Sequence, residues 1–306
     1  MLSVNDFISQ VPFDLYELAL FRLVVKHGGF TAAAQVAGLT QSAVTRQIQG
    51  IENALGIPLL RRTTRTLALT PAGEFLFREA SRLIGDVESS IRIIRQEYAG
   101  APREVRVAVS HTVGLAYLPG FFHLSVRQLS GVNYQVRARR SSELLLELEA
   151  DEHDIGVICP QNRLPRTVRV AHKFSDVFTL IGPEKLSAEY LALPEDKRKA
   201  WLRNQTWLLI DPNTVTGERL QKWLSRTGLR VTGEFSLDNF DLIINLVALG
   251  MGLSFVPARA LALYAQKRSI KRFPFAPRFT RELVVITRNR RTTPPHIQQF
   301  IANILF

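Results

Sequence analysis

Residues 31–56, TAAAQVAGLTQSAVTRQIQGIENALG, contain two helical patterns separated by a single glycine. Small residues dominate the first pattern, and Thr31 can cap its start. Gly38 suits the positive φ of a tight turn, and Thr40 can cap the helix that follows. The stretch therefore predicts a short helix, a turn, and a second helix over about residues 41–55.

The second of these helices is amphipathic. Its apolar positions form one stripe: Ala43, Val44, Ile48, Ile51 and Leu55. Its polar positions fall mainly on the opposite face: Gln41, Ser42, Thr45, Arg46 and Gln49. Arginine can bond guanine bidentately, glutamine can contact adenine, and hydroxyls can reach phosphate or base. Helix pairs with small residues at the turn are common, so the pattern alone indicates DNA recognition without excluding other roles.

The flanks of this stretch extend the same small domain. Leu18, Phe21, Val24 and Val25 lie at helical spacing before Gly28 and predict a helix over about residues 15–27. After Gly56, two short apolar runs at 57–60 and 67–69 enclose RRTTRT. They predict a small β-wing with arginines at its tip.

A long helical pattern follows from Thr70-Pro71, where threonine is a cap and proline occupies the first helical position. Its apolar positions recur at steps of three and four: Leu76, Ala80, Leu83, Val87, Ile91, Ile94 and Tyr98. This spacing approximates a heptad seam and predicts a dimerising helix. The alternative is an ordinary amphipathic helix that packs on its own domain.

Composition indicates a soluble globular protein, with 46% hydrophobic and 22% charged residues among 306. No stretch approaches the roughly 18 to 20 apolar residues of a membrane span. The first residues lack the basic region of a secretory signal, and the single cysteine, Cys159, cannot form an internal disulfide. These features predict a cytoplasmic protein without a membrane partner.

The net charge of +12 does not itself support DNA binding. Residues 1–100 carry ten Lys and Arg against nine Asp and Glu, whereas the remainder carries 29 against 18. The excess therefore lies outside the segment assigned to DNA. A solvated basic surface accounts for it, with an anionic ligand or weak non-specific attraction to DNA as alternatives.

From residue 104 onward, strand and helix patterns alternate and predict an α/β region. The expected strands are EVRVAV, YQVRAR, DIGVIC, VFTLIG, TWLLI, GLSFVP and ELVVIT, several with the apolar run of a buried parallel sheet. Helical patterns lie between them at 115–129, 143–149, 217–227 and 239–249.

The N-terminal region resembles the LysR-type transcriptional regulators. The resemblance is dense over residues 15–75 and rests on Leu18xxPhe21, on GGFTAAAQVAGLTQSAVTRQIQGIENALGIPLLRR and on LALTPAG. Two departures are Leu60, where the family usually has Phe, and an N-terminal lead about ten residues longer than usual. Neither alters a DNA-facing position.

The resemblance implies an α/β multidomain fold with an N-terminal winged helix-turn-helix (1–70), a long linker helix (71–100) and a C-terminal effector domain (101–306). DNA contacts are expected at Thr31, Gln41, Ser42, Thr45, Arg46, Gln49, Arg62 and Arg65. Glu52 is expected to support the helix rather than touch DNA. The expected partners are a near-palindromic double-stranded operator, further copies in a homodimer or homotetramer, and RNA polymerase.

The C-terminal region is similar to the family's two-lobed, periplasmic-binding-protein-like effector domain. Its lobes are expected at 101–162 with 269–306, and at 163–268, with crossings near 160–169 and 268–280. A small anionic effector is expected between the lobes, at strand ends and helix N-termini. The candidate residues are Ser110, His111, Thr112, Ser141, Ser142, Asp211, Asn213 and Asn239.

Each of these candidates has a simpler alternative. The serines and Thr112 can be helix caps, and His111 can be a surface residue. At most one of Arg139 and Arg140 should face the cleft, because neighbouring strand residues point to opposite sides. Cys159 is expected to be a buried apolar residue rather than a redox sensor.

The sequence indicates no enzyme. It contains no G-x-S-x-G elbow, phosphate-binding loop or H-E-x-x-H motif, and its six histidines are scattered. No catalytic residue, metal or cofactor is therefore expected. A solute-binding protein would require export. The remaining alternative is a ligand-independent DNA-binding repressor or architectural protein, which the 200-residue α/β region disfavours.

Overall fold

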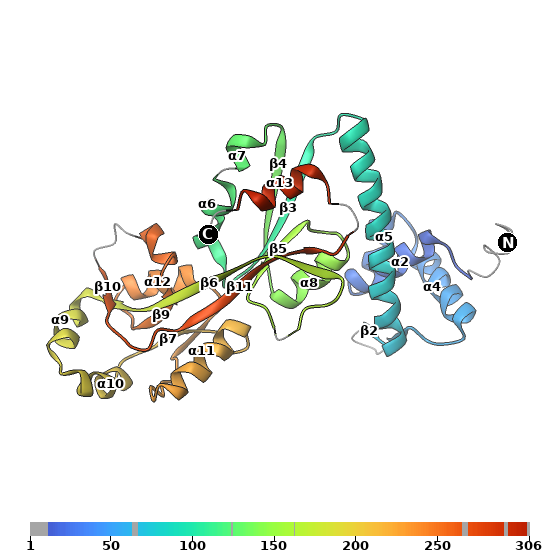
Figure 1. The fold of residues 1–306 in the computed structure, drawn as a ribbon. Helices are drawn as coiled ribbons and strands as arrows, with labels where there is room; N and C mark the ends of the chain where they lie inside the picture. Colours follow the sequence, from blue (N-terminus) through green and yellow to red (C-terminus); the bar gives the residue numbers. More distant parts are fainter. Residues whose placement is uncertain are drawn as a thin grey trace. The chain divides into compact units, whose positions relative to one another are not determined.

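The computed structural model describes residues 12–62, 67–123, 125–161, 163–264, 269–290 and 293–304. The chain divides into two compact units (Figure 1). The N-terminal unit comprises Met1–Ala101 with Glu149–Glu152, and the C-terminal unit comprises Pro102–Leu148 with His153–Phe306. Each unit is described by itself.

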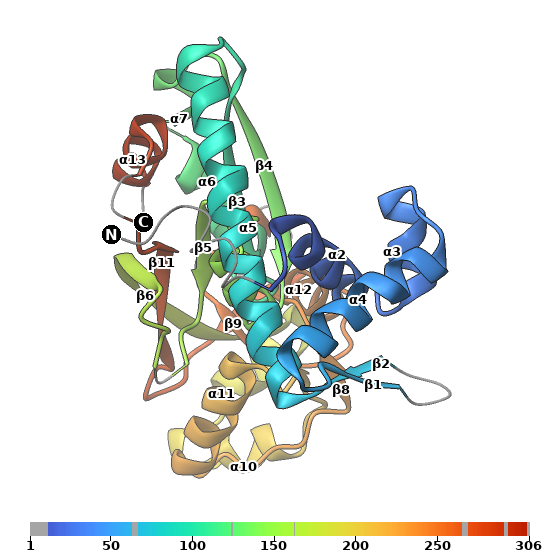
Figure 2. The ribbon, with the colours of Figure 1, turned by 90° about the vertical axis from the view of Figure 1, so that its right-hand side faces the viewer.

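The N-terminal unit consists of helices and a two-stranded ribbon. Its described elements are α2 (Leu15–Lys26), α3 (Phe30–Ala37), α4 (Gln41–Leu55), β1 (Leu60–Arg62), β2 (Leu67–Leu69) and α5 (Pro71–Tyr98). β1 and β2 pair antiparallel. Figure 2 shows α2, α3 and α4 gathered beside α5, with the ribbon following α4.

Side-chain hydrogen bonds cap three of these helices, two of them at threonines predicted from the sequence. Asp14 and Glu17 form a reciprocal capping box at the start of α2. The Thr40 hydroxyl accepts from the Ala43 amide over 3.2 Å, and the Thr70 hydroxyl from the Gly73 amide over 3.0 Å. The expected cap at Thr31 is wrong, because α3 begins earlier, at Phe30, and its cap has no side-chain hydrogen bond.

The core of this unit forms where the helices meet. Its fully buried members come from α2, α3 and α4 and include Phe21, Val24, Ala33, Val44, Ile48 and Ile51. The first turn of α5 packs beside the same core, where the backbone of Gly73 lies close to that of Leu59. A Cβ on Gly73 would lie 2.0 Å from the Leu59 carbonyl oxygen, so no larger residue fits there without a shift.

The seam expected on α5 divides into two parts. Leu76 packs partly against the core, and Ala80 is buried beside Leu18. The rest of the seam is exposed: Leu83 (43%), Val87 (41%), Ile91 (45%), Ile94 (57%) and Tyr98 (85%). The helix therefore anchors its first turns within its own unit and presents an apolar stripe beyond them. None of the helices in the described residues has the length and apolar character needed to cross a bilayer.

The C-terminal unit is a mixed α/β domain. Its elements up to the long strand are β3 (Arg103–Ser110), α6 (Gly114–Phe122), α7 (Ser125–Gln128), β4 (Val132–Arg139), α8 (Ser141–Glu149), β5 (Ile155–Ile158) and β6 (Val168–Pro183). The following elements are α9 (Glu184–Ala192), α10 (Glu195–Arg203), β7 (Leu208–Ile210), α11 (Val215–Arg226), β8 (Phe235–Leu237) and α12 (Phe240–Ala248). The last are β9 (Ser254–Pro257), η1 (Ala260–Tyr264), β10 (Ile270–Phe273), β11 (Thr280–Arg288) and α13 (Pro295–Ala302).

Two long strands, β6 and β11, connect the two lobes of this unit (Figure 1). In the sheet order β10-β6-β11-β5-β3-β4, β11 pairs with β5 and with β6 from Val168 to Val177. Beyond Val177, β6 pairs instead with β9 and β10. We name the elements around β3, β4 and β5 lobe I, and those around β7 to β10 lobe II. The crossing occurs where β6 changes partners.

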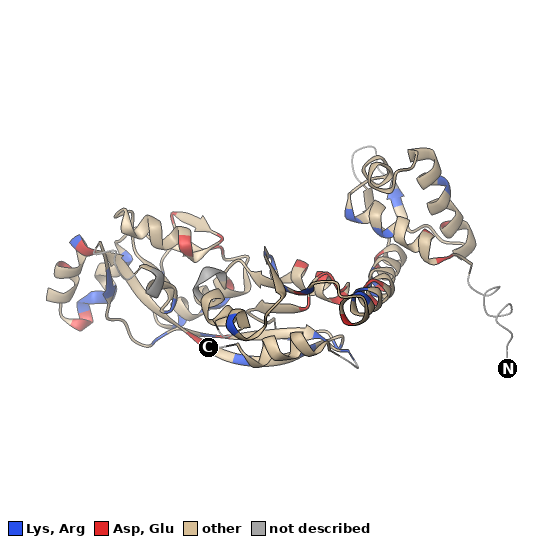
Figure 3. Ribbon diagram, turned by 90° about the horizontal axis from the view of Figure 1, so that it is seen from above, with Lys and Arg blue, Asp and Glu red and all other residues tan. Residues whose placement is uncertain are grey.

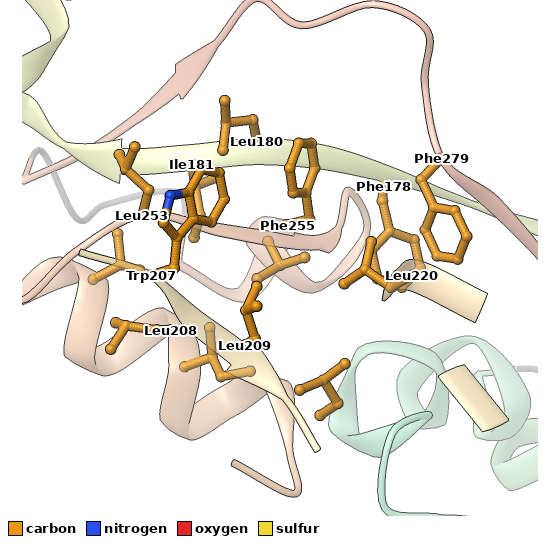
Figure 4. Close-up of a cluster of buried hydrophobic side chains, with 14 of the residues drawn as sticks. Phe178, Leu180, Ile181, Trp207, Leu208, Leu209, Leu220, Leu253, Phe255 and Phe279 are labelled. Atoms are coloured by element: carbon orange, nitrogen blue, oxygen red, sulfur yellow. The ribbon is translucent and has the colours of Figure 1, made fainter. Parts of the chain in front are cut away.

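Each lobe has its own apolar core. Lobe I buries Val105, Val107, Phe121, Val157, Leu283 and Phe300 on one side of its sheet. Lobe II is rich in aromatic residues, and Figure 4 shows Trp207, Phe255 and Phe178 among its aliphatic side chains. The rings of Trp207 and Phe255 are stacked with centroids 5.7 Å apart.

The α/β class expected from the sequence is confirmed, while several details differ. The strands β3, β4 and β5 are parallel, but β6 and β11 run antiparallel although both are largely apolar. An apolar run indicates burial on both faces, not strand direction. The single helix expected over 115–129 is two helices, and α9, α10, β8 and β10 were not anticipated.

Candidate functional site

Helix α4 presents a polar face to solvent. Gln41, Ser42, Arg46 and Gln49 are exposed and Thr45 is half-buried, whereas Val44, Ile48 and Ile51 are fully buried. The Thr40 and Ser42 hydroxyls lie 3.1 Å apart at the start of this helix. Thr31 is exposed on α3. Burial of the apolar stripe thus fixes which side chains of α4 remain available to a partner.

Glu52 holds the segment after α4 in place. Its Oε1 accepts hydrogen bonds from the amides of Leu59, over 2.7 Å, and Leu60, over 3.1 Å. The role expected for Glu52 as a support is therefore observed directly. The side chain of Arg62 and all of Arg65 lie outside the described residues, so these two wing candidates have no structural description.

A buried ion pair lies where the two lobes meet. The Arg281 Nε, on β11, donates to Asp176 Oδ2, on β6, over 2.8 Å, and neither side chain is exposed. The same guanidinium donates to the Thr216 hydroxyl of lobe II over 2.6 Å and to the Thr112 carbonyl of lobe I over 2.7 Å. One side chain therefore ties both crossing strands to both lobes.

Several polar atoms around this ion pair form no hydrogen bond with a described residue. They are Ser110 Oγ, the Tyr117 hydroxyl and Asp176 Oδ1, all on nearly inaccessible side chains. Burial raises the pKa of Tyr117, and the neighbouring Asp176 carboxylate raises it further. The Tyr117 hydroxyl and the Asp176 carboxylate are thus polar neighbours of each other, and Ser110 Oγ remains a buried polar atom without a partner among the described residues.

The lobes also meet beside this cluster. Arg219, on α11, donates to the Pro160 carbonyl over 2.7 Å and approaches Cys159 Sγ at 3.4 Å. The Arg259 guanidinium lies over the Tyr117 ring, 5.8 Å from its centroid. Cys159 itself is buried within the lobe I core, which agrees with the apolar role expected for it.

Some of the expected effector residues join this cluster. Thr112 is buried, with its hydroxyl 3.4 Å from that of Thr216, and Ser110 is buried at the end of β3. His111 is half-buried between them. At the start of α8, Ser141 is half-buried and Ser142 is exposed.

Other expected effector residues make local hydrogen bonds instead. Asp211 accepts from the amide and the side chain of Asn213, and Asn239 caps α12 by accepting from the Leu242 amide. Arg139 bonds Glu147 on α8 with its Nε, at 2.9 and 3.0 Å, while the Arg140 amide donates to Glu143. Among the described residues, these hydrogen bonds do not bring Asp211, Asn213, Asn239, Arg139 or Arg140 to the Arg281 cluster.

The sequence interpretation missed the residues at the centre of the cluster: Asp176, Thr216, Arg219, Arg259 and Arg281. A usable signal existed for two of them. Asp176 and Arg281 each directly precede an expected strand, VFTLIG and ELVVIT, and a charge buried next to such a strand needs a partner. In the described part of the chain, no group of three or more His, Cys, Asp or Glu is arranged to hold a metal ion.

Acidic and basic positions are interspersed along α5 (Figure 3).

The fold, the exposed polar face of α4 and the buried cluster around Arg281 define a helix-turn-helix DNA-binding protein with a two-lobed α/β domain. Comparison with known proteins agrees. The model for "Bacterial regulatory helix-turn-helix protein, lysR family" matches residues 15–74, and the model for "LysR substrate binding domain" matches residues 99–305. The chain belongs to the LysR family of DNA-binding transcriptional regulators.

Curated relatives are regulators rather than enzymes. A probable RuBisCO transcriptional regulator of Gracilaria tenuistipitata var. liui is 27% identical over 257 residues, covering 82% of each chain. The uncharacterized HTH-type transcriptional regulator YfeR of Shigella flexneri is 25% identical over 283 residues, covering 92% of this chain and 89% of the relative.

Solved structures share the fold over nearly the whole chain. Full-length OxyR from Pseudomonas aeruginosa has a TM-score of 0.66 at 18% identity, covering 95% of this chain and 94% of that one. Full-length CbnR complexed with its target DNA has a TM-score of 0.63 at 20% identity, covering 95% and 99%. These structures confirm the fold, and the two family models confirm the family expected from the sequence.

Proposed function

We propose that this protein is a dimeric regulator that contacts a near-palindromic operator with α4 and responds to a small anionic effector bound between lobes I and II. The observation that carries the DNA part is the orientation of α4. Gln41, Arg46 and Gln49 are exposed while Val44 and Ile48 are buried, so packing leaves the groove-compatible face free.

The side chains of α4 suit different tasks at the operator. Arg46 can donate two hydrogen bonds to guanine, and Gln41 or Gln49 can bond adenine bidentately. Ser42 and Thr45 can reach phosphate or base, and Thr31 lies exposed on the preceding helix. Arg62 and Arg65 are proposed as wing contacts to the DNA backbone or minor groove.

Arg46→Ala tests this assignment. If Arg46 contacts a base, specific operator binding weakens by about 1–3 kcal/mol while binding to random DNA changes little. Arg78→Ala is the matched control, because Arg78 is also an exposed arginine but lies on α5. Equal losses on operator and random DNA would make Arg46 a phosphate contact and contradict its proposed role.

The charges at the lobe junction support an anionic effector. Arg281 pairs with the buried carboxylate of Asp176, while Arg219 lies against Cys159 and Arg259 over the Tyr117 ring, so the three arginines exceed the one carboxylate described in this cluster. The unpartnered Ser110 hydroxyl supplies a polar atom for an oxygen of the effector. Ser141, Ser142 and His111 are proposed to line the lobe I wall, and Asp211, Asn213 and Asn239 the lobe II wall.

An effector acts by favouring one arrangement of the lobes over another, because only differential affinity shifts an equilibrium. A thermal-shift screen of small carboxylates on the full chain identifies a ligand, since a specific ligand raises the melting temperature. Ser142→Phe should then abolish the shift caused by that carboxylate and leave operator binding intact. An unchanged shift would remove Ser142 from the proposed site.

The other parts of the proposal concern assembly, partners, location and domain limits. The exposed stripe of α5 is proposed as the dimer contact, and two dimers as a tetramer. RNA polymerase is the proposed protein partner, and the cytoplasm the place of action. We propose the domain limits 1–70, 71–100 and 101–306. The solved structure of CbnR complexed with its target DNA supports the DNA partner by analogy.

A further inference from the structure

Lobe II contains a pocket of about 700 Å³ that the proposed effector site does not use. It lies between strands β6 and β10, helix α10 and the segment 274–278, and we call it the lobe II pocket. Its volume falls within the range of about 300–1,000 Å³ that is usual for small-molecule sites. Its lining includes neither Ser110, Thr112 nor Ser142.

The floor of the lobe II pocket is aromatic. Phe178, Tyr190, Phe255 and Phe273 all line it, and each is at most 3% exposed. The rings of Tyr190 and Phe273 lie 5.0 Å apart. The Tyr190 hydroxyl donates to the Pro274 carbonyl over 2.5 Å and holds the start of segment 274–278 against α9. These rings form a closed apolar layer beneath the pocket, and the apolar surface that a ligand can reach includes Val177, which is 37% exposed, and the half-buried Phe275.

The rim of the lobe II pocket is basic. Arg198, Lys199, Arg272 and Arg278 line it together with a single acid, Glu195. Arg198 donates to the Leu193 carbonyl and lies over the Tyr190 ring, and Lys199 donates to the Thr227 carbonyl. Arg272 and Arg278 are exposed and form no ion pair or hydrogen bond with the described residues. Four cations against one carboxylate favour an anionic group at the mouth.

The pocket also touches the connection between the lobes. Phe178, which lines the pocket, follows the crossing at Val177 on β6. Its ring lies 5.1 Å from the guanidinium carbon of Arg281 and 4.9 Å from the ring of Phe279, just before β11. The aromatic layer beneath the pocket therefore continues to the buried ion pair.

We propose that the lobe II pocket is a second ligand site that binds a small carboxylate with a flat aromatic body. The body packs on Val177 and Phe275, above the buried aromatic layer, and the carboxylate is held by Arg272 and Arg278. Two guanidiniums at the mouth can each bond the carboxylate oxygens in bidentate geometry. The site goes beyond the effector site between the lobes and does not depend on operator binding.

The test uses 1-naphthoate and the full chain without DNA, with calorimetry as the readout. Saturable binding is expected, and Arg272→Gln with Arg278→Gln should weaken it at least tenfold. Both positions are exposed, so the melting temperature of the double variant should stay close to that of the wild-type chain. Neutral 1-naphthalenemethanol should bind the wild-type chain more weakly than 1-naphthoate.

The matched control is Arg226→Gln with Arg230→Gln, which removes the same charge from exposed lobe II positions outside the pocket. It should bind 1-naphthoate within twofold of the wild-type chain. Ala258→Phe gives an independent test, because Ala258 lines the pocket and the added ring should displace 1-naphthoate. The absence of saturable binding at millimolar 1-naphthoate would overturn the proposal. Equal losses of 1-naphthoate affinity in the Arg272/Arg278 double variant and in the Arg226/Arg230 control would also overturn it. So would undiminished binding of 1-naphthoate in both the Arg272/Arg278 double variant and Ala258→Phe.

Discussion

Arg281 and Asp176 form an ion pair, 2.8 Å from Nε to Oδ2, with both side chains fully buried on the two strands that connect the lobes. Removing a charge from water is costly, and it is offset here because the guanidinium also bonds the Thr216 hydroxyl and the Thr112 carbonyl. Asp176 Oδ1 lacks a hydrogen bond to the described residues. The guanidinium is thus held by three hydrogen bonds, and the carboxylate also has the Tyr117 hydroxyl as a polar neighbour.

Arg281→Met should lower the free energy of unfolding of the C-terminal unit by about 3–5 kcal/mol, because Asp176 is left buried without its cation. The double change Arg281→Met with Asp176→Leu should cost less than the sum of the single changes, since it leaves no unpaired charge. Urea unfolding followed by tryptophan fluorescence measures this, because all three tryptophans lie in lobe II. Additive losses would show that the two side chains do not depend on each other.

Glu52→Ala should destabilise the segment that follows α4 by about 1–3 kcal/mol, because the amides of Leu59 and Leu60 lose a charged acceptor. Hydrogen exchange at these two amides should become faster. Operator and random DNA should both be bound less well, because the support affects the whole domain. Asn53→Ala, at the exposed neighbouring position, is the control. A loss confined to the operator would instead indicate a base contact by Glu52.

The sequence predicted the N-terminal unit almost element by element because its signals are local. Helical spacing, the caps at Thr40 and Thr70 and the glycine at position 38 each act within a few residues. Gly38 has a φ of 67°, as the turn requires. Thr31 shows the limit, since a cap-forming residue one position inside a helix cannot act as its cap.

The cluster around Arg281 was harder to predict because its contacts span long distances in the chain. Arg281 bonds Thr112 across 169 positions and Asp176 across 105. No short motif records such a pairing, and strand order decides it. The sequence did place Ser110 and Thr112 at the end of a strand, where parallel strands converge. Asn213 and Asn239 showed an equally good local pattern and are engaged in a turn and a cap.

The exposed stripe of α5 predicts an oligomeric contact. Leu83→Lys with Ile91→Lys should dissociate the dimer, because burying two lysines in an apolar seam leaves unpaired charges. Sedimentation equilibrium should show a shift towards the monomer, and operator affinity should fall with it. Asp86→Lys is the control, because Asp86 is exposed on α5 outside the stripe. An unchanged molecular mass in the double variant would contradict the assignment.

His153 should make the stability of the C-terminal unit depend on pH. Its side chain is buried, and its Nε2 lies 2.6 Å from Glu147 Oε2, which also accepts from Arg139. Burial lowers the pKa of His153 below its usual value of 6.5, and the charges of Arg106 and Arg139 lower it further, while Glu147 opposes them. The folded chain therefore keeps His153 neutral at a pH where the unfolded chain has begun to protonate it.

The unfolded state thus binds more protons below pH 6.5, so the free energy of unfolding that His153 contributes is present above this pH and is lost as the pH falls through the lowered pKa. His153→Gln should flatten the decline in stability between about pH 7 and pH 5, measured by urea unfolding with tryptophan fluorescence. His123→Gln, at an exposed histidine of the same unit, should leave the slope unchanged. If His153→Gln and the wild-type chain have the same slope, folding does not shift the pKa of His153, and a steeper decline in the variant would show that the Glu147 contact outweighs burial.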